Sequence, residues 1–246
     1  VIKGYILIYK NNKLIESVKI KGNRPLNNGI LKYNDHLIYG EYFSNLKRKP
    51  VKIFKLNPYT GKKKVILSLR NKRHIHFVQL DKKNKNKLLI GTGDKNNESG
   101  IFQFDLKSKL LKTTGRGNQK WRAVSILQKN NNLYWRSDCP YKNKYIYKYN
   151  RKTKKLTKLR KIGGPAYYSA FNSDQKMFIA TTIEDRKKHK AIIYISEKGE
   201  NWTELVEFKK DIWPEKLFGY GIIEFIKNQD KLKDLYINLK GLKKTI

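Results

Sequence analysis

The chain repeats one strand arrangement five times, and this repeat limits the folds that it can adopt. Each repeat begins with a short apolar strand and continues with a second strand that ends in polar residues, at a period of about 45 to 55 residues. The five pairs of segments are 29–33 with 36–42, 74–80 with 87–94, 122–127 with 132–138, 166–171 with 176–184, and 220–225 with 234–240. A period of this length is typical of a β-propeller blade, which is a sheet of four antiparallel strands.

Two further strands follow in each of the first four repeats, as a four-stranded blade requires. They are expected at 51–56 and 64–69, 100–105 and 110–114, 144–149 and 155–159, and 191–195 and 202–208. The first of these hairpins turns through Asn57-Pro-Tyr-Thr-Gly61, in which Pro and Gly supply turn geometry. We therefore predict an all-β chain that forms a single β-propeller domain over residues 1–246, with blades near 28–69, 74–114, 121–160 and 166–208.

The two ends of the chain complement each other. Segments 4–9 and 14–20 look like third and fourth strands, whereas residues near 220–239 supply only a first and a second strand. Together they would close a fifth blade and remove open sheet edges. Alternatively, an N-terminal segment is missing and would complete a sixth blade, because Val1 is not a start methionine.

Composition narrows the cellular setting and the partners. The lone Cys139 excludes an internal disulfide framework and favours a reducing, cytoplasmic compartment. No apolar run approaches the roughly 18 residues of a membrane span. The net charge of +36 comes mostly from Lys spread over the loops, which we interpret as a solvated surface. Polyanion binding through this Lys-rich surface is the alternative, and we expect a monomer.

One hairpin carries a family signature. Ser196-Glu-Lys-Gly-Glu-Asn-Trp202 matches the Ser, Gly and Trp of an Asp box, with Lys198 where the Asp belongs. The chain thus resembles the sialidase-like (BNR/Asp-box) β-propellers found among glycosidases and carbohydrate-associated proteins. It also resembles uncharacterised prokaryotic propellers through Gly-Glu-Tyr at 40–42, Arg-His-x-His at 73–76 and Thr-Gly-Asp at 92–94. The resemblance implies a propeller fold and a turn-packing role for the box, but no sialidase arginine triad can be placed.

Polar residues gather where the predicted strands share a rim. In an antiparallel blade the first strand begins at the rim where the second strand ends. Carboxylates end four second strands, at Glu41, Asp94, Asp138 and Glu184, in a chain with only 20 acidic residues. First strands begin near His74, His76, Trp121, Arg122 and Tyr167. We predict that Glu41, His74, His76, Asp94, Arg122, Asp138 and Glu184 face a common cavity.

This set predicts a carbohydrate-active site of the glycosidase type, which needs one protonated and one ionised carboxyl group. Glu41 and Asp94 are the expected pair, with Asp138 as a substitute, and His74 and His76 would bind hydroxyls or tune a carboxylate. The expected substrate-binding residues are Tyr42, Trp121, Trp135 and Tyr167 as stacking platforms, Arg122 for an anionic group, and Glu184.

Three alternatives to a glycosidase stay open. The first is a non-catalytic glycan- or protein-binding propeller, since this fold hosts both uses. The second is a polysaccharide lyase, in which His and Tyr42 abstract a proton and Arg122 neutralises a uronate. The third is a divalent cation near His74 and His76, although no cofactor is predicted. The sequence specifies neither the substrate nor the linkage.

Overall fold

The fold is all-β and belongs to the β-propeller class, as the repeat predicts. The computed structural model describes residues 4–22, 25–139, 144–184, 190–215, 219–227 and 229–244. Its contacts divide the chain into two compact units, Val1–Ala123 and Val124–Ile246. Each unit is described by itself, and the expectation of a single domain stays a prediction.

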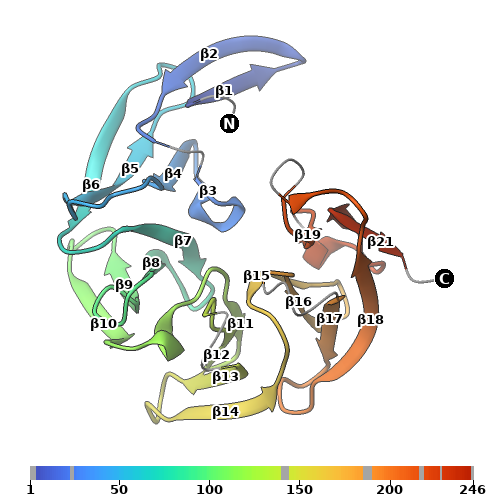
Figure 1. Ribbon diagram of the computed structural model, residues 1–246. Helices are drawn as coiled ribbons and strands as arrows, with labels where there is room; N and C mark the ends of the chain where they lie inside the picture. Colours follow the sequence, from blue (N-terminus) through green and yellow to red (C-terminus); the bar gives the residue numbers. More distant parts are fainter. Residues whose placement is uncertain are drawn as a thin grey trace. The chain divides into compact units, whose positions relative to one another are not determined.

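The first unit contains two complete blades and one two-stranded sheet (Figure 1). The first blade is β3 (Ile30–Tyr33), β4 (His36–Gly40), β5 (Val51–Leu56) and β6 (Lys63–Leu69), and the second is β7 (His74–Asp81), β8 (Asn84–Gly93), β9 (Gly100–Asp105) and β10 (Leu111–Arg116). The two-stranded sheet is β1 (Tyr5–Lys10) with β2 (Lys13–Lys19). Short 3-10 turns, η1 (Asn27–Gly29) and η2 (Gln119–Trp121), flank the blades.

The second unit repeats this plan. Its blades are β11 (Leu127–Lys129), β12 (Asn132–Arg136), β13 (Tyr145–Asn150) and β14 (Leu156–Lys161), and then β15 (Ala166–Phe171), β16 (Met177–Thr181), β17 (Lys190–Ser196) and β18 (Thr203–Lys210). A two-stranded sheet, β19 (Ile222–Phe225) with β20 (Ile237–Lys240), follows, with η3 (Gln229–Lys231) between its strands. All pairings are antiparallel. Closure of a fifth blade from the two ends of the chain stays a prediction.

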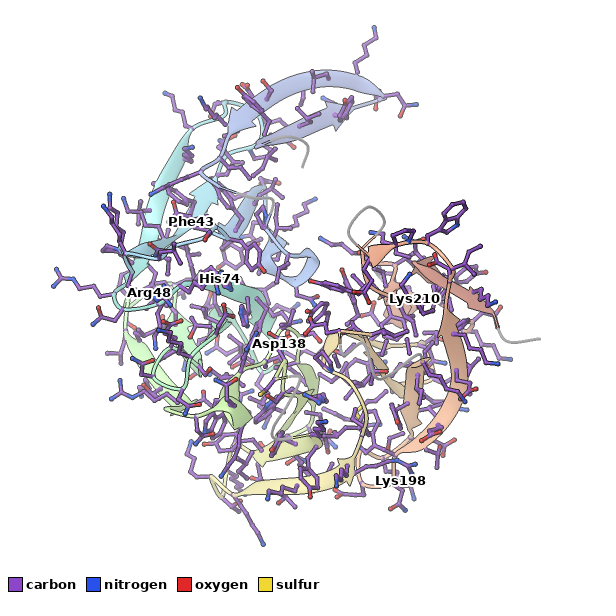
Figure 2. The ribbon with its side chains drawn as sticks, viewed as in Figure 1. Phe43, Arg48, His74, Asp138, Lys198 and Lys210 are labelled. Atoms are coloured by element: carbon purple, nitrogen blue, oxygen red, sulfur yellow. The ribbon has the colours of Figure 1, made fainter. Side chains whose placement is uncertain are left out.

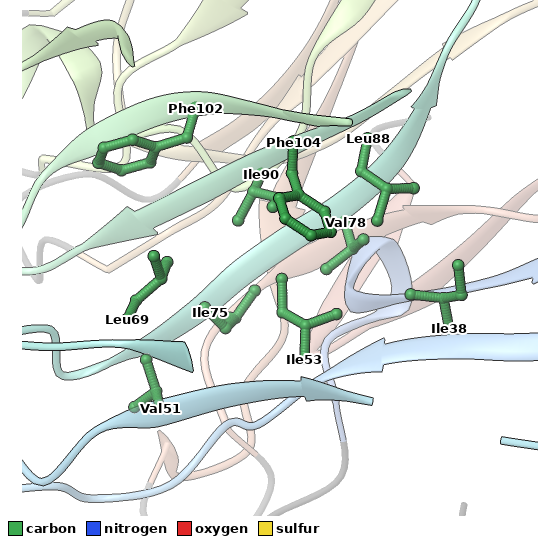
Figure 3. Packing of buried hydrophobic residues seen from close by; sticks show 10 residues of the cluster. All are labelled: Ile38, Val51, Ile53, Leu69, Ile75, Val78, Leu88, Ile90, Phe102 and Phe104. Atoms are coloured by element: carbon green, nitrogen blue, oxygen red, sulfur yellow. The ribbon is translucent and has the colours of Figure 1, made fainter. Parts of the chain in front are cut away.

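Neighbouring sheets within a unit pack face to face. In the first unit, Ile38 and Ile53 of one blade meet Val78, Ile90 and Phe104 of the next in a common core (Figure 3). Because β7 lies between two packed faces, its first five residues are all buried. Burial of each such Ile, Val or Phe side chain contributes about 1.5–3 kcal/mol. The sequence repeat therefore corresponds to a series of packed sheets, and each sheet needs its neighbour to bury one of its apolar faces.

A glycine sets how closely the two blades approach. A Cβ on Gly40 would lie 2.5 Å from Cγ2 of Ile75, so a larger residue would push β4 away from β7. The close approach allows the amide of Ile75 to donate a hydrogen bond of 2.9 Å to the carbonyl of Glu41. This contact fixes the end of β4 against the start of β7, where the predicted site residues lie.

The Ser196–Trp202 hairpin between β17 and β18 is a packed turn. The Gly199 amide donates to Ser196 Oγ (2.9 Å), and Trp202 Nε1 donates to the Gly199 carbonyl (3.1 Å). Gly199 has φ +88°, a conformation that favours glycine. Trp202 and Ser196 are both buried, so they hold the turn together, as expected from the resemblance.

Two strands depart most from the expected arrangement. The predicted strand at 122–127 begins only at Leu127, because the chain before it makes the η2 turn and its amide at Ala123 donates to the Trp121 carbonyl. The C-terminal segment adds a strand that was not predicted, β21 (Leu242–Lys244). After a turn at Gly241 (φ +62°), β21 pairs antiparallel with β18. Its three residues were too short and too polar to read as a strand.

Candidate functional site

The predicted site residues of the first unit meet where β4, β7 and β8 end or begin. His74 pairs with Gly93 across the β7–β8 ladder, so Asp94, the next residue, lies beside the histidines. A β-bulge between Ile75 and Phe77 leaves His76 as the extra residue of β7. Bulges turn a side chain away from regular alternation, and here the bulge brings His76 to the same place as His74.

The two imidazoles face each other through their Nε2 atoms. His74 Nε2 lies 3.1 Å from His76 Nε2, and both rings are almost fully buried. Each ring turns its other nitrogen to a backbone carbonyl: His76 Nδ1 lies 3.1 Å from Ala123 O, and His74 Nδ1 lies 3.4 Å from Phe43 O (Figure 2 labels His74 and Phe43). A carbonyl only accepts, so each Nδ1 carries the hydrogen in the neutral ring.

Asp94 is the anion at the centre of this cluster. Its Oδ1 lies 3.3 Å from His76 Nε2 and 3.4 Å from His74 Nε2, while its Oδ2 accepts a hydrogen bond from Arg73 Nη1 at 2.7 Å. Arg122 adds a second guanidinium, with Nη2 3.4 Å from Oδ1. The group of donor atoms from His74, His76 and Asp94, all within 4.8 Å of one another, is therefore a set that could hold a metal ion.

These contacts fix the protonation states. Burial opposes ionisation of Asp94, but hydrogen bonds and positive charge from His74 and His76 in their protonated forms hold the pKa of its carboxyl far below its usual range. Burial lowers the pKa of His74, although the interaction of its protonated ring with Asp94 opposes the shift. At neutral pH the cluster therefore presents an ionised carboxylate beside a neutral His74 imidazole.

A second layer positions Asp94. Gln119 Nε2 donates to the Asp94 carbonyl (2.7 Å), and the Asp94 amide donates to Glu98 Oε2 (3.2 Å). Glu98 is itself buried and bonded to Arg48 Nε. Gly93 leaves the space that His76 occupies, since a Cβ there would lie 2.3 Å from His76 Cε1. The sequence argument gave Glu98 no role, but the structure makes it the anchor of the Asp94 backbone.

Glu41 and Tyr42 lie beside the histidine cluster. Glu41 is buried, and its Oε2 accepts a hydrogen bond from the Lys52 amide at 2.8 Å. The ring of Tyr42 packs on His74 with centroids 4.2 Å apart, and Tyr42 is half-buried. Trp121 packs over Gly115 and is also half-buried. Tyr42 therefore borders the cluster, whereas the contact of Trp121 is with Gly115.

The second unit gathers its own charged group. Asp138 follows β12 and Glu184 follows β16, and both act on the same two neighbours. Burial lowers the pKa of Arg136 to about 10, against the opposing negative charges of Asp138 and Glu184. Burial and the charges of Glu184 and Asp138 also raise the pKa of Tyr220. The two carboxylates therefore share Arg136 and Tyr220 as electrostatic neighbours.

The aromatic residues expected to bind substrate differ in their surroundings. Trp135 is fully buried and stacks on Tyr147, with centroids 5.9 Å apart, so its ring face is not open to a sugar. The reason is its position within β12, whose last four residues are all buried. Tyr167 is half-buried and is the extra residue of a bulge between Ala166 and Tyr168. It thus occupies in β15 the place that His76 occupies in β7.

The structure brings the predicted residues together within each unit. Glu41, His74, His76, Asp94 and Arg122 gather in the first, and Asp138 and Glu184 in the second. That all seven face one cavity stays a prediction. Sequence reasoning gave no role to Arg73 and Arg136, although the choice of Arg at these positions was a signal. Arg is scarce among the 56 basic residues. An Arg beside a strand end is therefore a candidate partner for a buried carboxylate, which its guanidinium binds well.

Comparison with known proteins supports the fold. No protein-family model matches the chain, and no curated protein matches its sequence. Among solved structures, a GH74 xyloglucanase from Xanthomonas campestris matches with a TM-score of 0.63 and 10% identity, over 94% of this chain and 38% of that one. TolB from Acinetobacter baumannii matches with a TM-score of 0.53 and 13% identity, over 93% and 56%. An auxiliary nutrient binding protein from Bacteroides thetaiotaomicron gives 0.55 and 11%, over 87% and 52%.

These likenesses define the class of the protein, which is a β-propeller. The chain spans less than two thirds of the length of each of the three structures. Within the described residues, no helix has the length and apolar character needed to cross a bilayer.

Proposed function

We propose that this chain is a carbohydrate-active β-propeller with a glycosidase-like site in its first unit, related in fold to the sialidase-like Asp-box propellers. The observation that supports it best is the ionised Asp94 carboxylate, partly open to solvent and close to the guanidinium of Arg122, in a cluster whose His74 packs on the half-buried ring of Tyr42. Sugars are recognised by such a combination, because carboxylates bind hydroxyls and aromatic rings cover apolar sugar faces. The xyloglucanase and nutrient-binding neighbours are consistent with it.

Glu41 and Asp94 are the proposed carboxyl pair. Glycosidic cleavage needs one carboxyl group that donates a proton and one that is ionised. Asp94 is the ionised member, because the guanidinium groups of Arg73 and Arg122 lie 2.7 and 3.4 Å from its carboxylate oxygens. The proton-donating role then falls to Glu41, which ends β4 beside the start of β7. His74, His76 and Arg122 orient the substrate around Asp94.

A second carboxyl pair is available in the other unit. Asp138 and Glu184 both act electrostatically on Arg136 and Tyr220, so both lie within electrostatic range of the same two side chains. This shared environment is the specific observation in their favour. Variants of the two pairs therefore have to be compared in one experiment.

The test is a screen of the wild type against neutral and acidic glycans, followed by isosteric variants. We expect reducing ends to appear with one glycan class. Glu41→Gln and Asp94→Asn should each lower turnover by at least about 100-fold while glycan binding persists, because the change removes ionisation and keeps shape. Asp35→Asn, an exposed turn carboxylate, is the matched control and should leave turnover unchanged.

Other outcomes would assign other functions. If Asp138→Asn and Glu184→Gln abolish turnover instead, the pair lies in the second unit. An unsaturated product that absorbs in the ultraviolet, lost in Tyr42→Phe, would identify a lyase, which the contact of Tyr42 with His74 favours as second candidate. Saturable glycan binding without turnover on any glycan would contradict the enzyme proposal and leave a binding propeller.

A further inference from the structure

Three hydrogen-bond acceptors, His74 Nε2, His76 Nε2 and Asp94 Oδ1, converge between β7 and β8. When both imidazole rings are neutral, no hydrogen atom of the protein lies between these acceptors. His76 Nδ1 donates to Ala123 O and His74 Nδ1 to Phe43 O, so both Nε2 atoms present lone pairs. These lone pairs face each other across 3.1 Å and face Asp94 Oδ1 across 3.3 and 3.4 Å. Buried acceptors in this arrangement repel one another unless a cation lies between them.

The spacing of the three atoms suits a metal ion. An ion bound about 2.0–2.1 Å from each donor in tetrahedral geometry holds those donors about 3.3–3.4 Å apart. The three observed distances, 3.1, 3.3 and 3.4 Å, lie within a few tenths of that value. Two imidazoles and one carboxylate are a donor set for Zn²⁺ and related transition metals, whereas Ca²⁺ and Mg²⁺ prefer oxygen donors.

The surroundings also match those of metal ligands. A ligating histidine usually donates its other ring N–H to a carbonyl, which fixes the tautomer, and both histidines here do so. Arg73 holds the second oxygen of Asp94, and Gln119 and the carboxylate of Glu98 hold its backbone. The ligand atoms are thus set in place by contacts that do not depend on the ion.

We propose that His74 Nε2, His76 Nε2 and Asp94 Oδ1 bind one divalent transition-metal ion of the Zn²⁺ type, with the fourth position open. This inference concerns the same cluster as the proposed function but does not require that the substrate be a glycan. Asp94 is ionised in either case, because a metal ligand must be deprotonated. With Arg122 only 3.4 Å from the same carboxylate oxygen, the open position favours an anionic ligand, such as the carboxylate of an acidic sugar or hydroxide.

The competing explanation is a proton. If one imidazole carries a second hydrogen, that hydrogen bridges the acceptors and no metal is needed. The two explanations differ in what the purified chain binds after treatment with a chelator, which can be measured without any glycan.

The experiment titrates the chelator-stripped full chain with Zn²⁺ against a chromophoric competitor and counts bound metal by mass spectrometry. We expect one Zn²⁺ per chain, and a loss of affinity of at least about 100-fold in His74→Ala, His76→Ala and Asp94→Asn. His36→Ala is the matched control, since His36 begins β4 at the end opposite Gly40. Circular dichroism establishes that each variant is folded.

Co²⁺ substitution keeps the test independent of the variants. Four-coordinate Co²⁺ absorbs visible light far more strongly than the six-coordinate aqua ion, so the wild type should turn visibly coloured with one equivalent. Only weak aqua-type absorption, or equal Zn²⁺ affinity in the wild type and the three ligand variants, would overturn the proposal. Such a result with glycan turnover intact would leave the proposed function standing. Bound metal without turnover on any glycan would support the metal site and contradict the proposed enzyme function.

Discussion

Replacing Gly93 by Ala probes how tightly the histidine cluster is built. A Cβ at this position would lie 2.3 Å from Cε1 and 2.9 Å from Nε2 of His76, and 3.1 Å from Cγ of Arg122. Ordinary contact begins at 3.4 Å, so the His76 ring must retreat by about 1 Å. The ring is only 2% exposed, and the movement breaks its hydrogen bond to Ala123 O.

The expected cost follows from these contacts. Overpacking costs about 1–3 kcal/mol, and the broken hydrogen bond adds about 0.5–1.5 kcal/mol. Ala also lowers the conformational entropy of the unfolded chain, which offsets about 0.4–1 kcal/mol of this loss. This gain applies because Gly93 does not lie in the left-handed region. A net loss of about 0.5–4 kcal/mol lowers Tm by about 1–16 °C for a chain of this size. Zn²⁺ affinity should fall about 10–100-fold, since the ligand is displaced rather than removed.

The assay pairs thermal unfolding with the Zn²⁺ competition titration. Gly29→Ala is the matched control, because a Cβ there meets Pro25 Cβ at 3.5 Å and His76 O at 3.8 Å, which are ordinary contacts. We expect that variant to be as stable as the wild type or slightly more so. If Gly93→Ala behaves like Gly29→Ala in both measurements, then the cluster is loose and the steric reasoning is refuted.

The remaining predictions concern stability. Ile53→Ala, in the core between the first two blades, should cost about 2–5 kcal/mol in chemical unfolding, whereas the exposed Leu46→Ala should stay within about 0.5 kcal/mol; equal effects would contradict the packing of these sheets. Burial opposes ionisation of Glu224, but hydrogen bonds from Lys240, Tyr168 and Asn238 and the charge of Lys240 hold the pKa of its carboxyl below its usual range. A carboxyl group with a lowered pKa stabilises the fold at pH values above its unfolded pKa, and this stabilisation is lost as the pH falls through its folded pKa. The stability difference between wild type and Glu224→Gln should therefore be present at pH 7 and vanish in acid, and a difference that grows in acid would contradict it.

The sequence predicts most of this fold because the strand signal is local. Segments 51–56, 100–105 and 166–171 were expected with the bounds that β5, β9 and β15 have. Alternation and turn residues are sufficient for such strands, since each needs only its immediate neighbours. β11 was placed five residues too early because Arg122 and Ala123 are held outside the sheet by the η2 turn. That turn depends on Trp121 packing over Gly115, a contact that periodicity does not record.

The candidate site could also be predicted only in part. That His74, His76 and Asp94 lie together follows from strand order alone, because antiparallel strands bring their ends to one rim. The bulge at His76 and the convergence of the Nε2 atoms depend on the register of one ladder, which the sequence does not specify. The burial of Trp135 likewise depends on how two faces of β12 are covered, so an aromatic residue near a strand end could not be classified in advance.

The pairing of β21 with β18 bears on edge-to-edge association between copies of this chain. The outer strands β6, β10 and β14 each end a sheet within the described part of the chain, and each leaves a row of backbone groups that another strand could join. Exposed lysines line those strands, at Lys63, Lys64, Lys112, Lys158 and Lys161. The outer edge of β18 is instead covered by the chain's own last strand at Phe208, Lys209 and Lys210. Charged side chains on a sheet edge disfavour pairing with another chain, so we expect chemical neutralisation of these lysines to promote self-association of the folded protein.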